Sequence, residues 1–288
     1  MATTNRLYIL VAFVFSSVAA IFNIVSLGTE YWITGTALWI NSTSDTSEVT
    51  YGLFQGIYKR NVAFPYTYEI TMTCDFANNI CALLCGLDKE ERGNLLSSLY
   101  NNSYNPNYSM DNCPIITRTS YYHRSFEDPA VYVRQGTYVS PSAFINAGVW
   151  LSTLIFLLLA TIVGLLAANL ALYNTVANPI NFFLGVKSLY IYNSVAFCST
   201  VMYVTLWGSM YIQKIFHNLS IFDTLVGNFN SDKTAFLGYS YWISFISMAF
   251  YIGSMGILYY REYLNERDPR QKRVALDTEM TDPNLYLY

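Results

Sequence analysis

Residues 7–29 read LYILVAFVFSSVAAIFNIVSLGT and contain no Asp, Glu, Lys or Arg. An α-helix needs about 20 apolar residues to cross a hydrocarbon layer roughly 30 Å thick, so this stretch predicts a membrane span. Three more uncharged stretches follow, at residues 135–186, 188–213 and 234–260. Together they predict four spans, at about residues 7–27, 144–169, 188–211 and 239–260.

Charged residues are scarce over the whole chain of 288 residues. They make up 12% of it, about half the 25% that is typical of a soluble domain, while 53% of the residues are hydrophobic. This composition argues against a soluble enzyme and makes the lipid bilayer the first predicted partner. The net charge of −3 also argues against nucleic-acid binding.

Basic residues close to the spans predict their orientation. Five of them follow the fourth span and place the tail, residues 261–288, in the cytosol: Arg261, Arg267, Arg270, Lys272 and Arg273. With an even number of spans the N-terminus is cytosolic too, and residues 28–143 and 212–238 form two outer loops. The alternative is that residues 7–27 are a cleaved signal sequence, although the apolar run is long for a signal core and no clean small-x-small cleavage site follows it.

Sequons and cysteines agree with this sidedness. The glycosylation candidates, all in the predicted outer loops, are Asn41, Asn101, Asn107 and Asn218. The disulfide candidates, all in the first outer loop, are Cys74, Cys81, Cys85 and Cys113. An even set in an oxidising compartment predicts two disulfides, with three connectivities open. The fifth cysteine, Cys198, lies inside the third span and is expected to be a free thiol.

The first outer loop is too long to be a structureless connection. Residues 31–40, 51–58 and 62–74 are rich in aromatic and β-branched side chains and predict strands, while residues 78–100 predict a short amphipathic helix. The expected fold is an all-α four-helix membrane bundle with a small extracellular β-sheet. We expect residues 1–288 to form a single domain.

Two patterns predict how the spans meet their surroundings. Aromatic residues at the span ends predict an interfacial belt, formed by Tyr31, Trp32, Trp207, Tyr211, Tyr241, Trp242, Tyr259 and Tyr260. Small residues at four-residue spacing predict close helix packing, either inside the bundle or against a partner's helix. They are Ala12, Ser16 and Ala20 in the first span and Ala160, Gly164 and Ala168 in the second.

Residues suited to catalysis or ion transport are sparse. The chain has no HExxH, GxSxG, P-loop or GxGxxG pattern, and His123 and His217 stand apart from any metal-ligand spacing. The spans have none of the ionisable side chains that mark ion routes. Their most polar residues suit interhelical hydrogen bonds or the interface: Asn23, Asn146, Asn169 and Asn193. We therefore expect no enzymatic activity, no cofactor and no metal site.

A motif begins at the end of the first span. Residues 27–33 read LGTEYWI and residues 51–56 read YGLFQG, and the motif positions are Leu27, Gly28, Thr29, Trp32, Gly52, Leu53, Phe54 and Gly56. This arrangement resembles the claudin-like tetraspan superfamily, whose first outer loop carries a Trp, then Gly-Leu-Trp, then two cysteines. Phe54 stands where claudins have Trp, and no cysteine follows before Cys74. The Gly-Leu-Phe-x-Gly version is similar to the clarin family.

Further segments resemble the clarins in the same order along the chain. They are residues 178–190, 214–219 and 241–243, and the ending LYLY at 285–288. The resemblance covers all four spans but not residues 75–134, which look like an expansion.

Structural roles are expected for the motif residues. Gly28 would let the chain leave the helix through a left-handed turn, and Trp32 would lie flat on the sheet near the membrane interface. Gly52 and Gly56 would bracket a strand, where turns or a close backbone approach need glycine.

Resemblance to clarins implies a plasma-membrane protein of sensory cells that organises or accompanies other membrane proteins and is coupled to actin. The terminal Tyr286-x-Tyr288 predicts a cytosolic PDZ partner that binds the tail by strand addition. Two alternatives stay open: a claudin-like junction or barrier protein, and an auxiliary subunit of an ion channel. The sequence does not identify the partner membrane proteins.

Overall fold

The structure is a computed structural model that describes residues 2–40, 46–61, 66–86, 88–104, 138–176 and 184–267. The chain divides into two compact units. The helix unit contains Met1–Phe22, Leu159–Ser199 and Ile246–Tyr288. The sheet unit contains Asn23–Leu158 and Thr200–Phe245.

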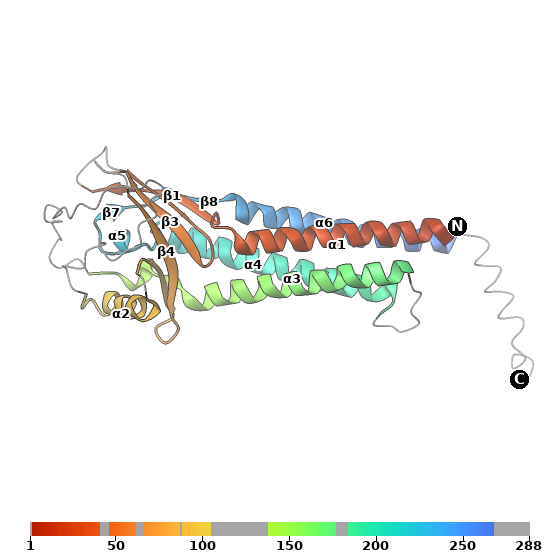
Figure 1. The fold of residues 1–288 in the computed structure, drawn as a ribbon, viewed down its shortest axis with the longest axis horizontal. Coiled ribbons are helices and arrows are strands. Elements are labelled where there is room, and N and C mark those ends of the chain that lie inside the picture. Colours follow the sequence, from red (N-terminus) through yellow and green to blue (C-terminus); the bar gives the residue numbers. More distant parts are fainter. Residues whose placement is uncertain are drawn as a thin grey trace, which may run out of the picture. The chain divides into compact units, whose positions relative to one another are not determined.

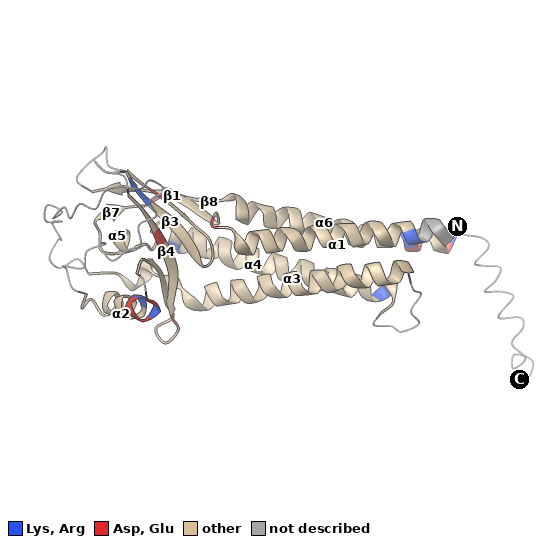
Figure 2. Ribbon diagram, viewed as in Figure 1, with Lys and Arg blue, Asp and Glu red and all other residues tan. Residues whose placement is uncertain are grey.

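Four helices are long and apolar enough to cross a membrane. They are α1 (Ala2–Gly28), α3 (Ala147–Val176), α4 (Val186–Met210, continued by a π-helical turn, Tyr211–Ile215) and α6 (Tyr239–Arg267), labelled in Figure 1. Charged residues lie near the ends of these helices and not along their middles (Figure 2). The prediction of four apolar spans is confirmed, and they are the helices of a multi-pass membrane protein. That residues 1–288 form one domain stays a prediction.

Small residues allow the helices of the helix unit to approach one another closely. Five of the six predicted positions are buried: Ala12, Ser16, Ala20, Ala160 and Ala168. At the sixth, Gly164, an added Cβ would lie 2.1 Å from the hydroxyl oxygen of Tyr251, so a larger residue would require the tyrosine to shift. Both stripes therefore pack inside the bundle and do not offer a face to a partner's helix.

The asparagines of the spans differ in their surroundings. In the helix unit, Asn193 accepts a hydrogen bond of 2.8 Å from Ser16 on another helix. In the sheet unit, Asn23 accepts one of 3.0 Å from the hydroxyl of Tyr203. Both side chains are buried, which confirms the expected interhelical hydrogen bonds. Asn169 lies exposed on α3.

One antiparallel sheet organises the sheet unit. Its strands follow the order β6-β5-β4-β3-β2-β1-β7, and β8 pairs with β1 beside β7. The strands are β1 (Ile33–Trp39), β2 (Thr46–Tyr51), β3 (Gln55–Asn61), β4 (Tyr66–Asp75), β5 (Ile80–Leu84), β6 (Ile145–Asn146), β7 (Phe229–Asn230) and β8 (Ala235–Leu237). The sheet thus draws strands from both predicted outer loops.

The segment 78–100 corrects the prediction of a single helix. Its first part is the strand β5, and only Lys89–Tyr100 forms a helix, α2. All five side chains of β5 are buried, so the strand is a continuous apolar run without alternation. Such a run cannot be told from a buried helix by periodicity. The apolar core here joins β5 and α2 to the short helix α5 (Phe222–Leu225).

Candidate functional site

Trp32, the central motif residue, is fully buried in the sheet unit. Its ring centroid lies 5.3 Å from that of Trp207, 6.2 Å from Tyr203 and 6.3 Å from Tyr241. Its indole Nε1 donates a hydrogen bond of 2.6 Å to the carbonyl oxygen of Ser26. The expectation that Trp32 lies flat on the sheet is therefore wrong, because the indole packs between helices that supply its polar partner.

The same packing corrects the predicted aromatic belt. Trp32, Trp207 and Tyr241 are buried, whereas Tyr31 and Trp242 are exposed in the sheet unit. In the helix unit Tyr259 and Tyr260 are exposed as well. Tyrosine and tryptophan combine an apolar ring with one polar atom, which suits both a membrane interface and a hydrogen-bonded core. Their position at a span end does not distinguish the two.

Hydroxyl groups fasten the end of α1 to the start of α6. Thr29 Oγ1 lies 2.6 Å from Ser240 Oγ, and Ser26 Oγ donates a hydrogen bond of 2.9 Å to the carbonyl of Ser240. The backbone of Trp32 joins the sheet, because the Trp32 N–H donates a hydrogen bond of 3.0 Å to the carbonyl oxygen of Tyr51. The motif therefore links a helix pair to the first hairpin.

Two motif glycines are required by close backbone approach. At Gly52 an added Cβ would lie 2.3 Å from the carbonyl oxygen of Thr29, and at Gly56 it would lie 2.3 Å from Tyr51 Cβ. The expected close approach is confirmed, although the two glycines flank the β2–β3 turn and do not bracket a strand. Gly28 corrects another expectation, since an added Cβ there meets nothing within 4 Å and its φ is not left-handed.

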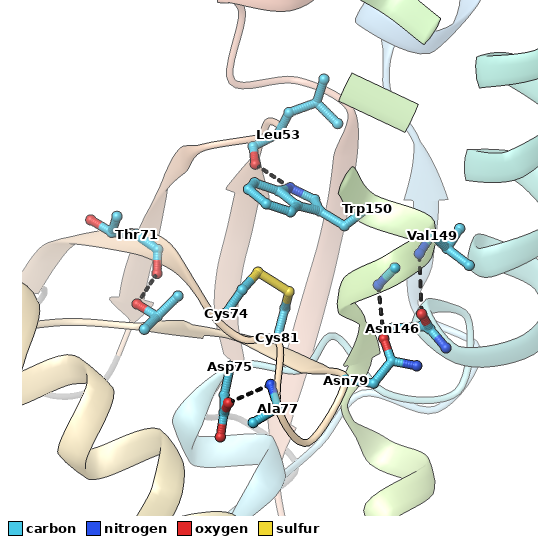
Figure 3. Close-up of a disulfide and its surroundings, with 12 residues drawn as sticks. Leu53, Thr71, Cys74, Asp75, Ala77, Asn79, Cys81, Asn146, Val149 and Trp150 are labelled. Atoms are coloured by element: carbon cyan, nitrogen blue, oxygen red, sulfur yellow. Dashed lines mark hydrogen bonds between the residues drawn. A yellow bond between two sulfur atoms is a disulfide. The ribbon is translucent and has the colours of Figure 1, made fainter. Parts of the chain in front are cut away.

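A disulfide joins Cys74 and Cys81, which lie directly opposite each other on β4 and β5. Figure 3 shows the bond beside Trp150, whose indole Nε1 donates a hydrogen bond of 2.8 Å to the carbonyl of Leu53 in the β2–β3 turn. Trp150 thus holds the β2–β3 turn near the start of α3, and the disulfide closes the β4–β5 hairpin beside it.

The β4–β5 turn also caps α3. Asn79, at a positive φ of 55°, accepts a hydrogen bond of 2.8 Å from the backbone N–H of Gly148 through its side chain. Asn146 accepts one of 3.1 Å from the N–H of Val149 (Figure 3). The first N–H groups of a helix have no partner within it, and these side chains supply one. The disulfide therefore stabilises a hairpin that fixes the beginning of a membrane span.

Disulfide mapping is expected to yield one further pair. Cys85 is also disulfide-bonded, and Cys113 lies outside the described residues. Of the three connectivities of these four cysteines, only one contains the pair Cys74–Cys81. We predict that proteolysis without reductant, followed by mass spectrometry, gives a Cys85–Cys113 peptide that disappears on reduction. A Cys74–Cys113 peptide would contradict the pairing. Cys198 is free, as expected.

A buried polar cluster connects the second outer loop to the sheet. Asp223 of α5 is 5% exposed and accepts a hydrogen bond of 2.7 Å from the hydroxyl of Tyr58 on β3. The guanidinium of Arg60 lies over the rings of Trp39 and Phe229, at 5.7 and 5.6 Å. Burial raises the pKa of the Asp223 carboxyl, while the hydrogen bond from Tyr58 and the charge of Arg60 oppose the shift. The sequence alone gave no signal for this cluster.

We predict that Asp223→Asn makes the protein less sensitive to pH. In the folded protein the pKa of the Asp223 carboxyl is raised above its unfolded value of about 3.9. At pH values above about 3.9 the native state therefore binds more protons than the unfolded state. Stability of the natural protein then falls as pH rises from that value through the folded pKa. Asparagine keeps an acceptor for Tyr58 and does not ionise. Thermal unfolding should show the variant to be the more stable protein at pH 7.5.

Asp223→Ala serves as the control for this cluster. It removes the acceptor and leaves the buried Tyr58 hydroxyl poorly bonded, so it should be less stable than Asp223→Asn by about 1–2 kcal/mol at every pH, because neither variant ionises at this position. If Asp223→Asn were less stable than the natural protein at pH 7.5, Arg60 would be shown to outweigh burial and keep the carboxylate charged.

The remaining predicted site residues are spread over the sheet unit. Asn101 is exposed, whereas the side-chain oxygen of Asn218 accepts hydrogen bonds from Ser220 and Thr224. His217 pairs with Asp232 at 2.8 Å on the surface. Among the described residues no three His, Cys, Asp or Glu side chains gather to hold a metal ion. The predicted sites outside the described residues are Asn41, Asn107, Cys113 and the terminal Tyr286 and Tyr288, and the isolated His123 lies outside them too.

No protein-family model matches the chain, and no curated protein matches it by sequence.

Proposed function

We propose that the chain is a clarin-like tetraspan protein of the plasma membrane that organises or accompanies other membrane proteins and has no enzymatic activity. The observation that supports this most is the joining of the two motif segments. Trp32 donates its backbone N–H to Tyr51, and Gly52 lies against the backbone of Thr29. The motif residues serve packing, and this suits a protein that acts through the surfaces it presents to partners.

The proposal places both termini in the cytosol and the sheet unit outside the cell. It also includes the sensory-cell setting and the link to actin that the clarin resemblance implies. On the cytosolic side, the tail at residues 261–288 carries the proposed PDZ ligand. Deleting Leu287 and Tyr288 should then release a cytosolic partner while leaving membrane partners bound.

Co-purification tests the proposal. The tagged full chain is extracted from native sensory-cell membranes with a mild detergent after cross-linking, and the partners are identified by mass spectrometry. We expect a defined membrane-protein partner in stoichiometric yield. A monomer recovered alone, under conditions in which a known complex from the same membranes stays intact, would overturn the proposal.

Two assays separate this function from the alternatives. A claudin-like barrier protein should increase adhesion between non-adherent cells that express it, and we expect no increase here. An auxiliary channel subunit should change the currents of a co-expressed candidate channel, whereas an organising protein should change the position of its partner and leave the single-channel currents unaltered.

Glycosylation tests the sidedness of the sheet unit. Asn101 is exposed where α2 ends, and Ser103 beside it is exposed too. In the other described sequon, Ser220 is fully buried and donates a hydrogen bond of 2.6 Å to the carbonyl of Ala143. We predict that Asn101→Gln removes one glycan, seen as a mobility shift that glycosidase treatment abolishes.

Asn218→Gln is the matched control and should leave the mobility unchanged. A shift with Asn218→Gln would contradict the assignment of the glycan. A chain that carries no glycan at any sequon, in cells that glycosylate a co-expressed reporter, would count against an outer location of the sheet unit.

A further inference from the structure

Three aromatic side chains form a cluster at the start of α3, which we call the aromatic foot: two exposed phenylalanines and the half-buried Trp150. Phe54 from the β2–β3 turn and Phe76 from the β4–β5 turn each lie 6.4 Å from Trp150 in the first turn of α3, measured between ring centroids. Phe54 is 47% exposed and Phe76 is 56% exposed. The foot therefore presents apolar surface from two separate hairpin turns.

The foot lies at the start of a candidate membrane span, α3, whose first exposed side chains are apolar. Below Trp150 the exposed side chains of α3 in the sheet unit are large and apolar: Leu151, Ile155 and Leu158. A helix rises about 1.5 Å per residue, so Trp150 stands about 7–8 Å above Ile155 along the helix axis. This is the level at which aromatic residues gather around the start of a span.

The two turns are rigid where they carry the phenylalanines. The disulfide Cys74–Cys81 closes the β4–β5 hairpin, and Asp75 accepts a hydrogen bond of 2.9 Å from the N–H of Ala77 inside the turn. The other turn is fastened by the hydrogen bond from Trp150 to Leu53, drawn in Figure 3. Neither phenylalanine turns inward, although Leu53 next to Phe54 is buried.

Polar groups surround the foot in the way that a bilayer interface requires. Asn78 and Asn79 share the β4–β5 turn with Phe76 and are exposed, and the exposed Gln55 follows Phe54. A rigid phenylalanine at the tip of a turn is unfavourable in water, because its apolar surface stays hydrated. At the interface the rings would enter the acyl boundary while the amides reach the headgroups.

We propose that the aromatic foot is a lipid-binding surface: Phe54 and Phe76 insert into the interfacial layer of the bilayer beside the first turn of α3. The occupant is the phospholipid of the leaflet on the sheet side. The two turns then hold the sheet to the membrane surface in addition to the chain connections at the helices. This inference holds whichever partner the protein organises.

Photo-crosslinking tests the foot in the full chain, reconstituted into nanodiscs of phosphatidylcholine. Benzoylphenylalanine is placed, one position at a time, at Phe54 and Phe76, at Ile155 as a lipid-facing control and at Glu48 as an aqueous control. Glu48 lies three residues before Tyr51 on β2, about 10 Å along the strand from the turn. Each variant is first shown to keep the Cys74–Cys81 disulfide and to elute as a single species.

We expect lipid adducts at positions 54 and 76 in yields close to that at 155 and about ten-fold above that at 48, as for aromatic side chains at a membrane interface. Lipid adducts at 155 alone would overturn the proposal. Adducts of positions 54 and 76 with a second protein chain, in place of lipid, would overturn it as well and identify the foot as a protein interface.

Discussion

Replacing Trp32 with alanine is expected to lower the free energy of unfolding of the sheet unit by about 4 kcal/mol, in the range for truncating a fully buried aromatic side chain. The indole is inaccessible and contacts the rings of Tyr203, Trp207 and Tyr241. Its loss also leaves the carbonyl of Ser26 without the indole donor. Thermal and denaturant unfolding of the purified protein in nanodiscs would measure the change.

Two variants control this result. Trp32→Phe keeps most of the apolar ring and loses the hydrogen bond to Ser26, so it should cost about 1 kcal/mol from the bond and more from the space left unfilled. Trp242→Ala removes a tryptophan that is 55% exposed and should change stability by less than about 0.5 kcal/mol. Equal losses for Trp32→Ala and Trp242→Ala would show that the buried aromatic cluster does not stabilise the sheet unit.

The second large effect is expected for Gly52→Ala. A Cβ at this position would come within 2.3 Å of the carbonyl oxygen of Thr29 and 3.1 Å of Glu30 Cα. Both atoms belong to the backbone, which cannot rotate away as a flexible side chain can. The hairpin turn would have to move from the end of α1, at a cost of about 3 kcal/mol. Unfolding in nanodiscs, and the yield of correctly folded protein in cells, would measure the loss.

Gly28→Ala is the matched control, because Gly28 belongs to the same motif and an added Cβ there meets open space. Alanine favours a helix over glycine by about 1 kcal/mol, so this variant should be as stable as the natural protein or slightly more stable. A large loss at Gly28 together with a small one at Gly52 would contradict the packing described for the motif.

The spans were predictable because a bilayer leaves few solutions to a chain. Backbone groups inside lipid must be paired within the helix, and charged side chains are costly there, so the charge-free stretches mark the helices directly. Strand β1 followed from an aromatic and β-branched run in the same way, but β2 lies almost wholly before the predicted strand at 51–58, and residues 52–54 of that stretch form the β2–β3 turn. The strand β5 was not predicted, because a continuous apolar run cannot be told from a buried helix, and one of the two strands that pair with it, β6, comes from a distant segment.

The candidate sites were harder to predict, since they depend on which side chains meet. The motif identified Trp32 and Gly52, but it did not show that the indole packs between helices. The sequence around Phe76 predicts only a turn, and the sequence around Trp150 predicts only a membrane span, so neither indicates that the two rings are neighbours. The pair Tyr58 and Asp223 joins two loops that are separated by two membrane helices, so no spacing rule finds it.

The strand β1 has one partner strand that is synthesised directly after it and two that are synthesised late. β2 follows it directly, whereas β7 and β8 emerge only after α3 and α4 have been made. Until then one edge of β1 exposes unpaired N–H and C=O groups, and such an edge invites pairing with other chains. A chain that ends between Ile215, where the third span ends, and Phe229 would contain three of the four spans but leave that edge of β1 unpaired. Premature stop codons in this interval should therefore yield inserted, aggregation-prone chains and not a smaller working protein.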